Sequence, residues 1–477
     1  MAAEMTTMLD RRRFLDFSAT GLSGAALFSL LDQKQSAMAA AAKKSPHPIA
    51  KAKRAIHICL VGGFSQVDSF DYKTKLEKLH GKSLPGDAKP DTFFGSAGLL
   101  RKSEWKFCRR GESGLWVSDL FPQLAGVADE LTVIHSMVAD TANHMPAMFQ
   151  ENSGFQANGF PSLGSWLSYG LGNESELLPT FVVLPDARSL PNGGASNWSS
   201  GFLPARHQGT LFGSGTRPIR NLFADKPIAE AAENDALGLL GELNRSHLAQ
   251  RGKNDLLKAR IKAYELAAKM QVSVPEAVNF ADEPASLQEA YGIGQKETND
   301  CGRRCLLARR LLECGVRFVQ LFSGGAFGGK PRHGWDGHEN NFQNHQREAK
   351  LIDQPIAALL ADLKQRGMLN DTLILFTSEF GRTPFTQSNG TLGLGRDHNP
   401  EGFTTWLAGA GLKKGIAYGE TDEVGWKAVE KLVTWPDFHA TVLHLLGIDH
   451  EALTYYHNGI ERRLTNVHGR VIKDLLA

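Results

Sequence analysis

The chain has 477 residues, of which 42% are hydrophobic and 22% are charged, an ordinary composition for a globular protein. A formal net charge of +2 gives no basis for binding to nucleic acid or to a membrane surface. The five cysteines follow neither a disulfide nor a zinc-finger spacing, and we interpret them as small buried residues.

The N-terminus carries the features of an export signal. Residues 10–15 (DRRRFL) match the twin-arginine pattern, and the apolar segment 17–31 follows it. Residues 37–39 offer a small-x-small cleavage site, so we expect a signal peptide over 1–39 and a periplasmic or secreted location. The alternative is a membrane anchor, but a span needs roughly 20 apolar residues, more than this segment supplies. The basic, proline-containing residues 40–54 are predicted to be a linker, and no later stretch predicts a membrane span.

Apolar runs alternate with amphipathic segments from residue 55 to the C-terminus. Strands are predicted at 55–61, 131–137, 178–184, 316–322, 372–376 and 404–408. Helices are predicted from 144 through 149 and at 160–167, 227–246, 253–271, 301–314, 352–363 and 436–446. Because strands and helices alternate, we predict one α/β domain over 55–477, with a mostly parallel sheet and a helical insert at about 225–315.

Polar clusters occupy residues 332–338, 377–384 and 395–400. The second cluster follows the buried strand predicted at 372–376, and ligands of open parallel sheets gather beyond the carboxyl ends of the strands. The first and third clusters are rich in glycine, so we expect them to be loops that reach the same mouth. The sequence therefore predicts one shared site.

Asp336, His338 and His398 are the candidate ligands of a divalent metal in these clusters, and Glu379 is a candidate to complete the set. Imidazole and carboxylate are ligands that a transition metal such as zinc prefers. The alternative is that single His and Asp residues in glycine-rich loops cap turns or contact solvent.

Arg382, Glu379 and His144 are the candidate catalytic residues. Arg382 could neutralise an anionic substrate through a bidentate contact. His144 or Glu379 could act as acid or base beside a water activated by the metal. The alternative is that Glu379 and Arg382, three residues apart, pair with each other.

Ser65, Asp68 and Trp198 are candidate substrate-binding residues outside the clusters. Ser65 and Asp68 follow a Gly-Gly pair at the end of the first strand, where the backbone can approach a ligand closely. Gly-Gly turns are common, so this signal is weak. Trp198 lies in the polar segment 186–216, and a long loop with an aromatic residue is typical of a lid or a binding loop.

The motifs resemble those of a known family. They are residues 62–71 (GGFSQVDSFD), 334–342 (GWDGHENNF), 377–384 (TSEFGRTP) and 396–400 (RDHNP). With the export signal, they resemble the exported domain-of-unknown-function 1501 family, which is similar in fold to the alkaline phosphatase and sulfatase superfamily. The resemblance implies a three-layer sandwich with metal at the strand ends.

The match to that superfamily has gaps. Gly62 and Gly63 stand where its members carry a metal-binding Asp, and the helix that would begin with a nucleophile begins near Asn143. No Cys-x-Pro-x-Arg signature is present, which argues against a formylglycine mechanism. Asp336, with His338, resembles the ligand pair of one metal, and His398 is similar to the last metal-binding His.

Two hypotheses follow for the function. The first is a metal-dependent hydrolase of sulfate or phosphate esters, acting on an anionic small molecule or a polysaccharide with zinc, manganese or calcium. The second is a catalytically silent relative, with or without metal, that binds glycan or a partner protein at the same site.

Overall fold

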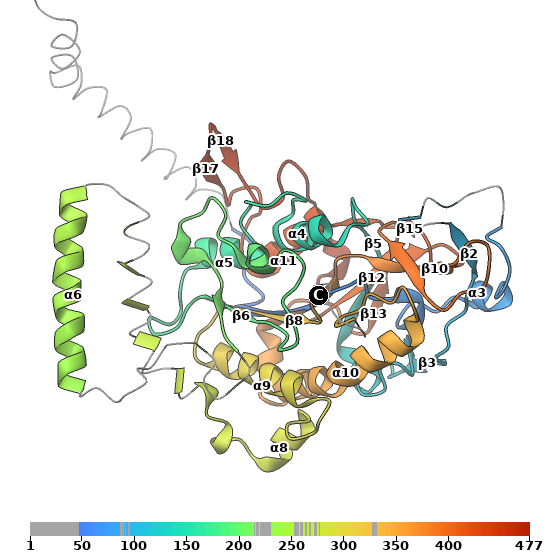
Figure 1. Cartoon of the computed structure of the whole chain (residues 1–477), viewed down its shortest axis with the longest axis horizontal. Coiled ribbons are helices and arrows are strands. Elements are labelled where there is room, and N and C mark those ends of the chain that lie inside the picture. The colour runs from blue at the N-terminus through green and yellow to red at the C-terminus, as the bar shows by residue number, and fades with distance from the viewer. Residues whose placement is uncertain are drawn as a thin grey trace, which may run out of the picture. The chain divides into compact units, whose positions relative to one another are not determined.

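The computed structural model describes the chain in a set of ranges (Figure 1). These are 47–85, 90, 92–93, 96–213, 215, 219, 230–251, 257, 261–262, 265–266, 269–270, 274–275, 277–326 and 332–477. The signal peptide predicted at 1–39 and residues 40–46 of the linker predicted at 40–54 lie outside these residues. No described helix is both long and apolar enough to cross a bilayer.

A nine-stranded sheet forms the centre of the fold, in the order β13-β5-β12-β9-β1-β8-β6-β7 with β16 beside β5. Its strands are β1 (Arg54–Leu60), β5 (Leu131–Val138), β6 (Phe181–Leu184), β7 (Thr210–Leu211), β8 (Phe318–Ser323), β9 (Thr372–Ser378), β12 (Phe403–Gly409), β13 (Ile416–Tyr418) and β16 (Val433–Thr434). Among the described strands of this sheet, only β12 runs antiparallel to its neighbours, β5 and β9. The predicted α/β fold with a mostly parallel sheet is therefore confirmed.

Side chains alternate across the central strand β1 and supply both faces of the sheet. Ile56, Ile58 and Leu60 pack in one hydrophobic cluster, whereas Ala55 and Cys59 pack in another. A strand buried on both faces is nearly all apolar because no side chain meets water, and His57 is the one polar residue between Ala55 and Leu60. This is why 55–61 was recognisable as a strand.

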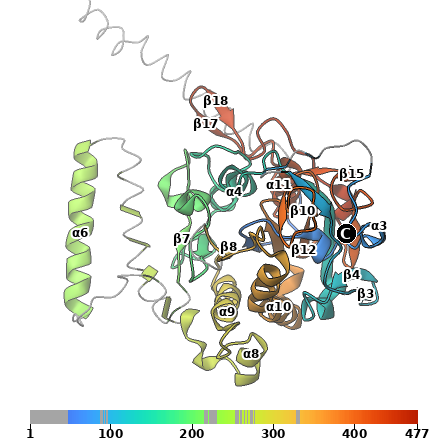
Figure 2. The ribbon, with the colours of Figure 1, turned by 45° about the vertical axis from the view of Figure 1, so that its right-hand side comes forward.

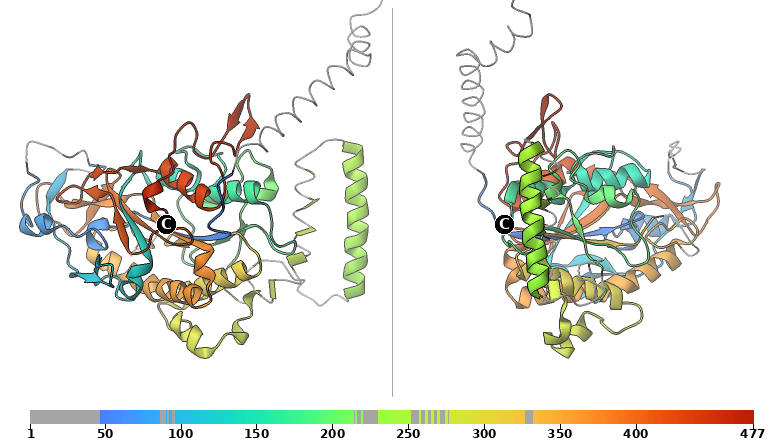
Figure 3. Two further views of the ribbon diagram at one scale, coloured as in Figure 1. Left: turned by 180° about the vertical axis from the view of Figure 1, so that it is seen from behind. Right: turned by 60° about the vertical axis from the view of Figure 1, so that its left-hand side comes forward.

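Helices cover both faces of the sheet. On one side lie α9 (Asn299–Glu313) and α10 (Asn341–Gln365), side by side in Figure 2. On the other lie α4 (His144–Ser153), α5 (Leu163–Leu171) and α11 (Trp435–Leu445). Figure 3 shows the red α11 and the orange α10 on opposite sides of the sheet. The predicted three-layer sandwich is the observed arrangement.

A second, three-stranded sheet corrects the expectation that residues 395–400 form a loop. β2 (Ala97–Leu100), β10 (Gly381–Gln387) and β11 (Arg396–Asn399) pair in the order β11-β10-β2. Glycines flank β11, but its own four residues are all buried, so backbone pairing satisfies polar groups that water does not reach. The smaller elements α3 (Thr74–Lys78), β3 (Phe107–Arg110), β4 (Leu115–Ser118), β14 (Glu420–Thr421), β15 (Ala428–Glu430), β17 (Tyr455–His457) and β18 (Ile460–Arg462) lie outside both sheets.

The predicted helical insert is partly described. It contains α6 (Glu230–Arg251), α8 (Ala285–Ala290) and α9. Most of the helix predicted at 253–271 lies outside the described residues.

Gly62, just after β1, tests how tightly the chain is packed at the strand ends. It has φ +121°, and a Cβ there would lie 2.6 Å from Asp336 N and 2.8 Å from Trp335 N. Gly159 shares a positive φ, +98°, but a Cβ there would meet nothing within 4 Å. Gly62→Ala should therefore lower the unfolding temperature more than Gly159→Ala, by the equivalent of about 1–3 kcal/mol of overpacking. Equal losses in calorimetry would contradict the close backbone approach.

Candidate metal centre

Distant segments bring four side chains together beyond the ends of the parallel strands. His144 is the first residue of α4, which follows β5, and His398 lies on β11. Asp336 and His338 come from the segment between β8 and α10. One potential ligand atom from each of these residues, an imidazole nitrogen or a carboxylate oxygen, lies within 4.8 Å of the other three. The structure thus brings Asp336, His338 and His398 together, as expected, and adds His144 to them.

Asp336 Oδ1 is the atom on which the three imidazoles converge. It lies 2.8 Å from His338 Nε2, 3.5 Å from His144 Nε2 and 3.5 Å from His398 Nε2. The Nε2 atoms of His338 and His398 are themselves only 2.8 Å apart. Four donor atoms are therefore gathered around one point.

The opposite nitrogen of each ring faces a hydrogen-bond acceptor. His144 Nδ1 lies 2.8 Å from Glu379 Oε1, His398 Nδ1 lies 2.6 Å from Ala142 O, and His338 Nδ1 lies 2.5 Å from Gln387 Oε1. Each acceptor favours the tautomer with a proton on Nδ1, which leaves the Nε2 lone pair directed at the cluster. Two such lone pairs at 2.8 Å repel unless a proton or a metal cation lies between them. The donor set, three imidazoles and one carboxylate, fits a transition-metal ion.

Arg382 contacts Asp336 from the interior of the protein. Its side chain is fully buried, and its Nη2 donates to Asp336 Oδ1 over 2.6 Å. Nη2 also donates to the carbonyl oxygen of Gly62, while Nε donates to that of Gly63 and Nη1 to that of Arg396. Burial opposes ionisation of Asp336, but Arg382 and the three histidines outweigh it and hold the pKa of this carboxyl far below its usual range. With its donors committed inside the protein, Arg382 does not face a substrate, contrary to our expectation.

Glu379 lies behind His144 and not among the converging donors. Its Oε1 accepts from Gly62 N over 2.8 Å as well as contacting His144 Nδ1. Burial alone would lower the pKa of His144, but hydrogen bonds to Asp336 and Glu379 raise it above 6.5. A carboxylate on the outer nitrogen of a ligating histidine fixes its orientation and increases its basicity. The geometry thus gives Glu379 the place of a carboxylate partner, where we expected a ligand or a base.

The residues of the motif at 379–382 pack against the four convergent residues or against their neighbours. Between Glu379 and Arg382, the buried Phe380 ring packs 5.0 Å from the His144 ring and 4.5 Å from the His398 ring. A Cβ on Gly381 would collide with the Gln66 side chain. Each position of this short motif therefore positions a neighbour of the cluster.

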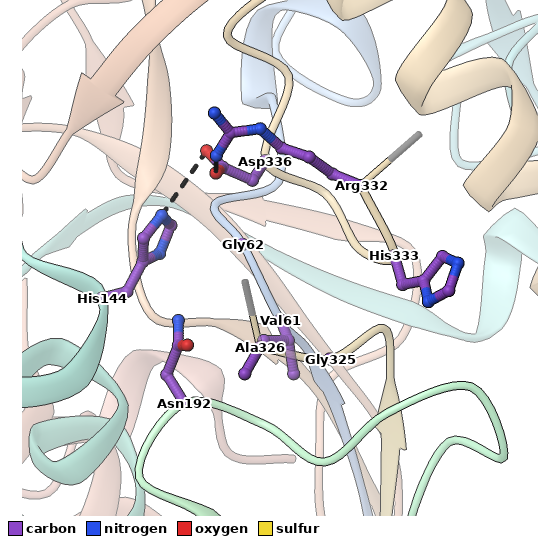
Figure 4. A pocket seen from close by; sticks show the side chains of 9 residues that line it. All are labelled: Val61, Gly62, His144, Asn192, Gly325, Ala326, Arg332, His333 and Asp336. Atoms are coloured by element: carbon purple, nitrogen blue, oxygen red, sulfur yellow. Dashed lines mark hydrogen bonds and ion pairs between the residues drawn. The ribbon is translucent and has the colours of Figure 1, made fainter. Parts of the chain in front are cut away.

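A pocket opens beside the cluster (Figure 4). Its lining residues are Val61, Gly62, His144, Asn192, Gly325, Ala326, Arg332, His333 and Asp336. Arg332 and His144 approach Asp336 from two sides, and Arg332 also pairs with Glu339. The pocket thus joins two of the four convergent residues to further basic side chains.

A sequence-family comparison identifies the chain's relatives. The model of a family described as a protein of unknown function, DUF1501, matches residues 52–476. The chain belongs to the DUF1501 family. The resemblance inferred from the motifs is thereby confirmed. Among curated proteins, no sequence matches this DUF1501 protein.

Solved structures similar to this DUF1501 protein include members of the alkaline phosphatase and sulfatase group. The sulfatase PsFucS1 from Pseudoalteromonas sp. is 13% identical, with 87% of this chain and 72% of that chain covered and a TM-score of 0.36. The lipoteichoic acid synthase LtaP from Listeria monocytogenes is 10% identical, with coverages of 83% and 73% and a TM-score of 0.33. The periplasmic domain of EcEptC from Escherichia coli, in complex with Zn, is 11% identical, with coverages of 84% and 83% and a TM-score of 0.33.

Ser65 and Asp68 of the DUF1501 protein lie in a separate buried network. Ser65 Oγ donates to Asp68 Oδ2 over 2.6 Å, and Asp68 also accepts from Arg396 Nε over 2.8 Å and Asn341 Nδ2 over 2.9 Å. Both residues are at most 1% exposed. They stabilise the fold beneath the site, which corrects our expectation that they bind substrate.

Trp198 also differs from expectation. It is 3% exposed and packs in the hydrophobic cluster under α4 and α5, with its ring 5.8 Å from that of Phe322. From the same loop, Asn192 lines the pocket instead. Sequence reasoning missed Asn192 and Gln387, because no motif marks a residue whose role is set by a partner far along the chain.

The four convergent donors predict a metal-binding test. His398→Ala should lose one equivalent of bound Zn²⁺ or weaken Zn²⁺ binding at least tenfold. Tenfold is about the smallest loss of metal affinity expected when a residue that merely supports a ligand is replaced. His333→Ala removes a pocket histidine outside the cluster, so it should retain the metal. Titration calorimetry with metal analysis of the whole chain checks both. Equal Zn²⁺ binding by both variants would rule out the centre.

The buried Arg382–Asp336 pair predicts a stability effect that metal reverses. Arg382→Gln removes the buried guanidinium from Asp336 Oδ1 and leaves only Arg332 at the other oxygen, at a cost of up to about 3–5 kcal/mol in the metal-free protein. Added Zn²⁺ should recover much of this loss because it replaces the missing positive charge. The matched control is Arg396→Gln, which breaks the buried Arg396–Asp68 pair, neither member of which is one of the four convergent residues. The unfolding temperature of this control should fall. Adding Zn²⁺ should raise it by no more than it raises the unfolding temperature of the unaltered chain.

Proposed function

We propose that this DUF1501 protein is an exported, metal-dependent hydrolase of sulfate or phosphate esters. The convergence of His144, His338 and His398 on Asp336 Oδ1 carries the proposal. Such a constellation at the carboxyl ends of parallel strands is where α/β proteins bind ligands. It is also expensive to bury without a cation, because the imidazole lone pairs face one another.

Zinc is the proposed metal, ahead of manganese and calcium. Three nitrogen donors and one carboxylate oxygen suit zinc, whereas calcium is held by oxygen ligands. When bound, a divalent cation supplies Lewis acidity, which polarises an ester oxygen and activates water. His144, His338, His398 and Asp336 would hold it.

The protein's own residues then orient the reaction. Glu379 keeps His144 Nδ1 protonated and its Nε2 directed inward, over the 2.8 Å contact. Arg332 and His333 place basic side chains at the pocket, which favours an anionic ester, either a small molecule or a polysaccharide. The start of α4 carries Asn143 and His144 in place of Ser, Thr or Cys, which favours activated water as the nucleophile.

The signal peptide that the sequence predicts at 1–39 supports export by the twin-arginine route to the periplasm or beyond. That route carries folded proteins, which suits a chain that acquires its metal before export. We propose no stable membrane span after cleavage and no nucleic-acid partner.

The second candidate is a catalytically silent relative that binds glycan or a partner protein. One observation favours it: Arg382 donates to Asp336 and to three carbonyl oxygens, so it does not receive an anion. In that case the cluster would stabilise a binding surface, with Arg332 and His333 recognising anionic groups.

Turnover of 4-nitrophenyl sulfate, phosphate and phosphodiester separates the two. The first candidate predicts hydrolysis by the Zn²⁺-loaded chain, loss on chelation and recovery on adding metal. Glu379→Gln should lower kcat/KM by about 10–100-fold, the usual cost of removing a carboxylate behind a ligating histidine. His333→Ala should mainly raise KM. A metal-loaded, folded chain that hydrolyses none of these esters would support the silent relative.

A further inference from the structure

A second polar cluster lies inside the core, between the central sheet and α4. His57 and Cys59 point from β1, Thr377 from β9 and Gln320 from β8, while Glu151 comes from α4. None of these side chains is more than 2% exposed. Their neighbours on this face of the sheet are apolar, so the polar groups depend on one another.

The potential ligand atoms of this cluster are close together. Cys59 Sγ lies 3.2 Å from His57 Nε2, which lies 3.9 Å from Glu151 Oε1. Sulfur, nitrogen and carboxylate oxygen all lie within 4.8 Å of one another. Thr377 Oγ1 contacts both His57 Nε2, at 2.7 Å, and Glu151 Oε1.

Two buried oxygens of the cluster have no hydrogen-bond partner among the described residues. They are Glu151 Oε2 and Gln320 Oε1. Among the described residues, His57 is the ion-pair neighbour of the Glu151 carboxylate. No described lysine or arginine side chain lies within 4.0 Å of that carboxylate. A carboxylate in an apolar core without a cation is costly, and an unpartnered oxygen adds to the cost.

We propose that His57, Cys59 and Glu151 form a second metal site, selective for a zinc-like divalent cation. A thiolate and an imidazole are ligands of zinc and not of magnesium or calcium. On binding, the Cys59 thiol and the Glu151 carboxyl each release one proton to solvent, and Sγ and a carboxylate oxygen bond to the metal. The two negative ligands and the divalent cation then sum to zero charge, which the low-dielectric core favours.

This site is structural. Its three proposed ligands are at most 1% exposed and none of them lines the pocket of Figure 4, so the site is closed to solvent. The metal would join β1 to α4. Gly62 follows β1, and His144 is the first residue of α4. The buried metal would therefore hold in place the centre formed by His144, Asp336, His338 and His398 (the outer centre) without taking part in its chemistry. The inference does not depend on any hydrolytic activity.

Cadmium tests this site separately from the outer centre, because thiolate–Cd²⁺ bonds give an ultraviolet charge-transfer band and the outer centre has no sulfur. The whole chain, unfolded with chelator and refolded with Cd²⁺, should show this band. Cys59→Ser should abolish it. His398→Gln, which alters the outer centre, and Cys301→Ser/Cys305→Ser, which removes a pair of neighbouring buried thiols outside the proposed site, should retain it.

The result that overturns the proposal is a band that is absent from the unaltered chain or unchanged in Cys59→Ser. If Cys59→Ser does not refold, as judged by circular dichroism, Glu151→Gln decides. It keeps the shape of the side chain but removes one negative ligand, so Cd²⁺ titration of the band should show at least a tenfold weaker affinity. An unchanged affinity would mean that the cluster is a protonated hydrogen-bond network only.

Discussion

The ion pair between Arg382 and Asp336 is the interaction on which the candidate centre depends. Arg382 is fully buried, so its charge must be balanced inside the protein, and Asp336 supplies the balance. The same guanidinium binds the carbonyl oxygens of Gly62 and Gly63. One side chain thereby connects the end of β1, the start of β10 and the segment that carries the convergent carboxylate.

The outer centre and the core cluster share a design in which each imidazole is held by a neighbour from another element. Glu379, just after β9, holds His144 on α4, whereas Thr377 on β9 contacts His57 on β1. Thr377 and Glu379 are two residues apart, so their side chains leave the strand on the same side, and about 6–7 Å of extended chain separates the two sets of contacts. The central strands therefore organise polar groups at two depths, one at the mouth of the fold and one within its core.

Much of the fold could be predicted because the strands are continuous apolar runs, as at 372–376, and the helices carry apolar stripes, as in α10. The convergence of Asp336, His338 and His398 followed from their positions beyond strand ends. Side-chain direction could not be predicted. Arg382 points into the protein because Asp336 and three carbonyl oxygens surround it, and Trp198 turns into the core because Phe322 offers an apolar contact. Such partners lie far away in the sequence.

α4 also fixes the distance and the relative direction of two polar side chains, one in each cluster. His144 is its first residue and Glu151 lies further along the same helix, about two turns on, so both face the sheet from one side. Adding or removing a single residue between them would rotate one relative to the other by about 100° and shift it by about 1.5 Å. Relatives that keep both polar clusters should therefore tolerate changes of side chain in α4 but not changes of its length.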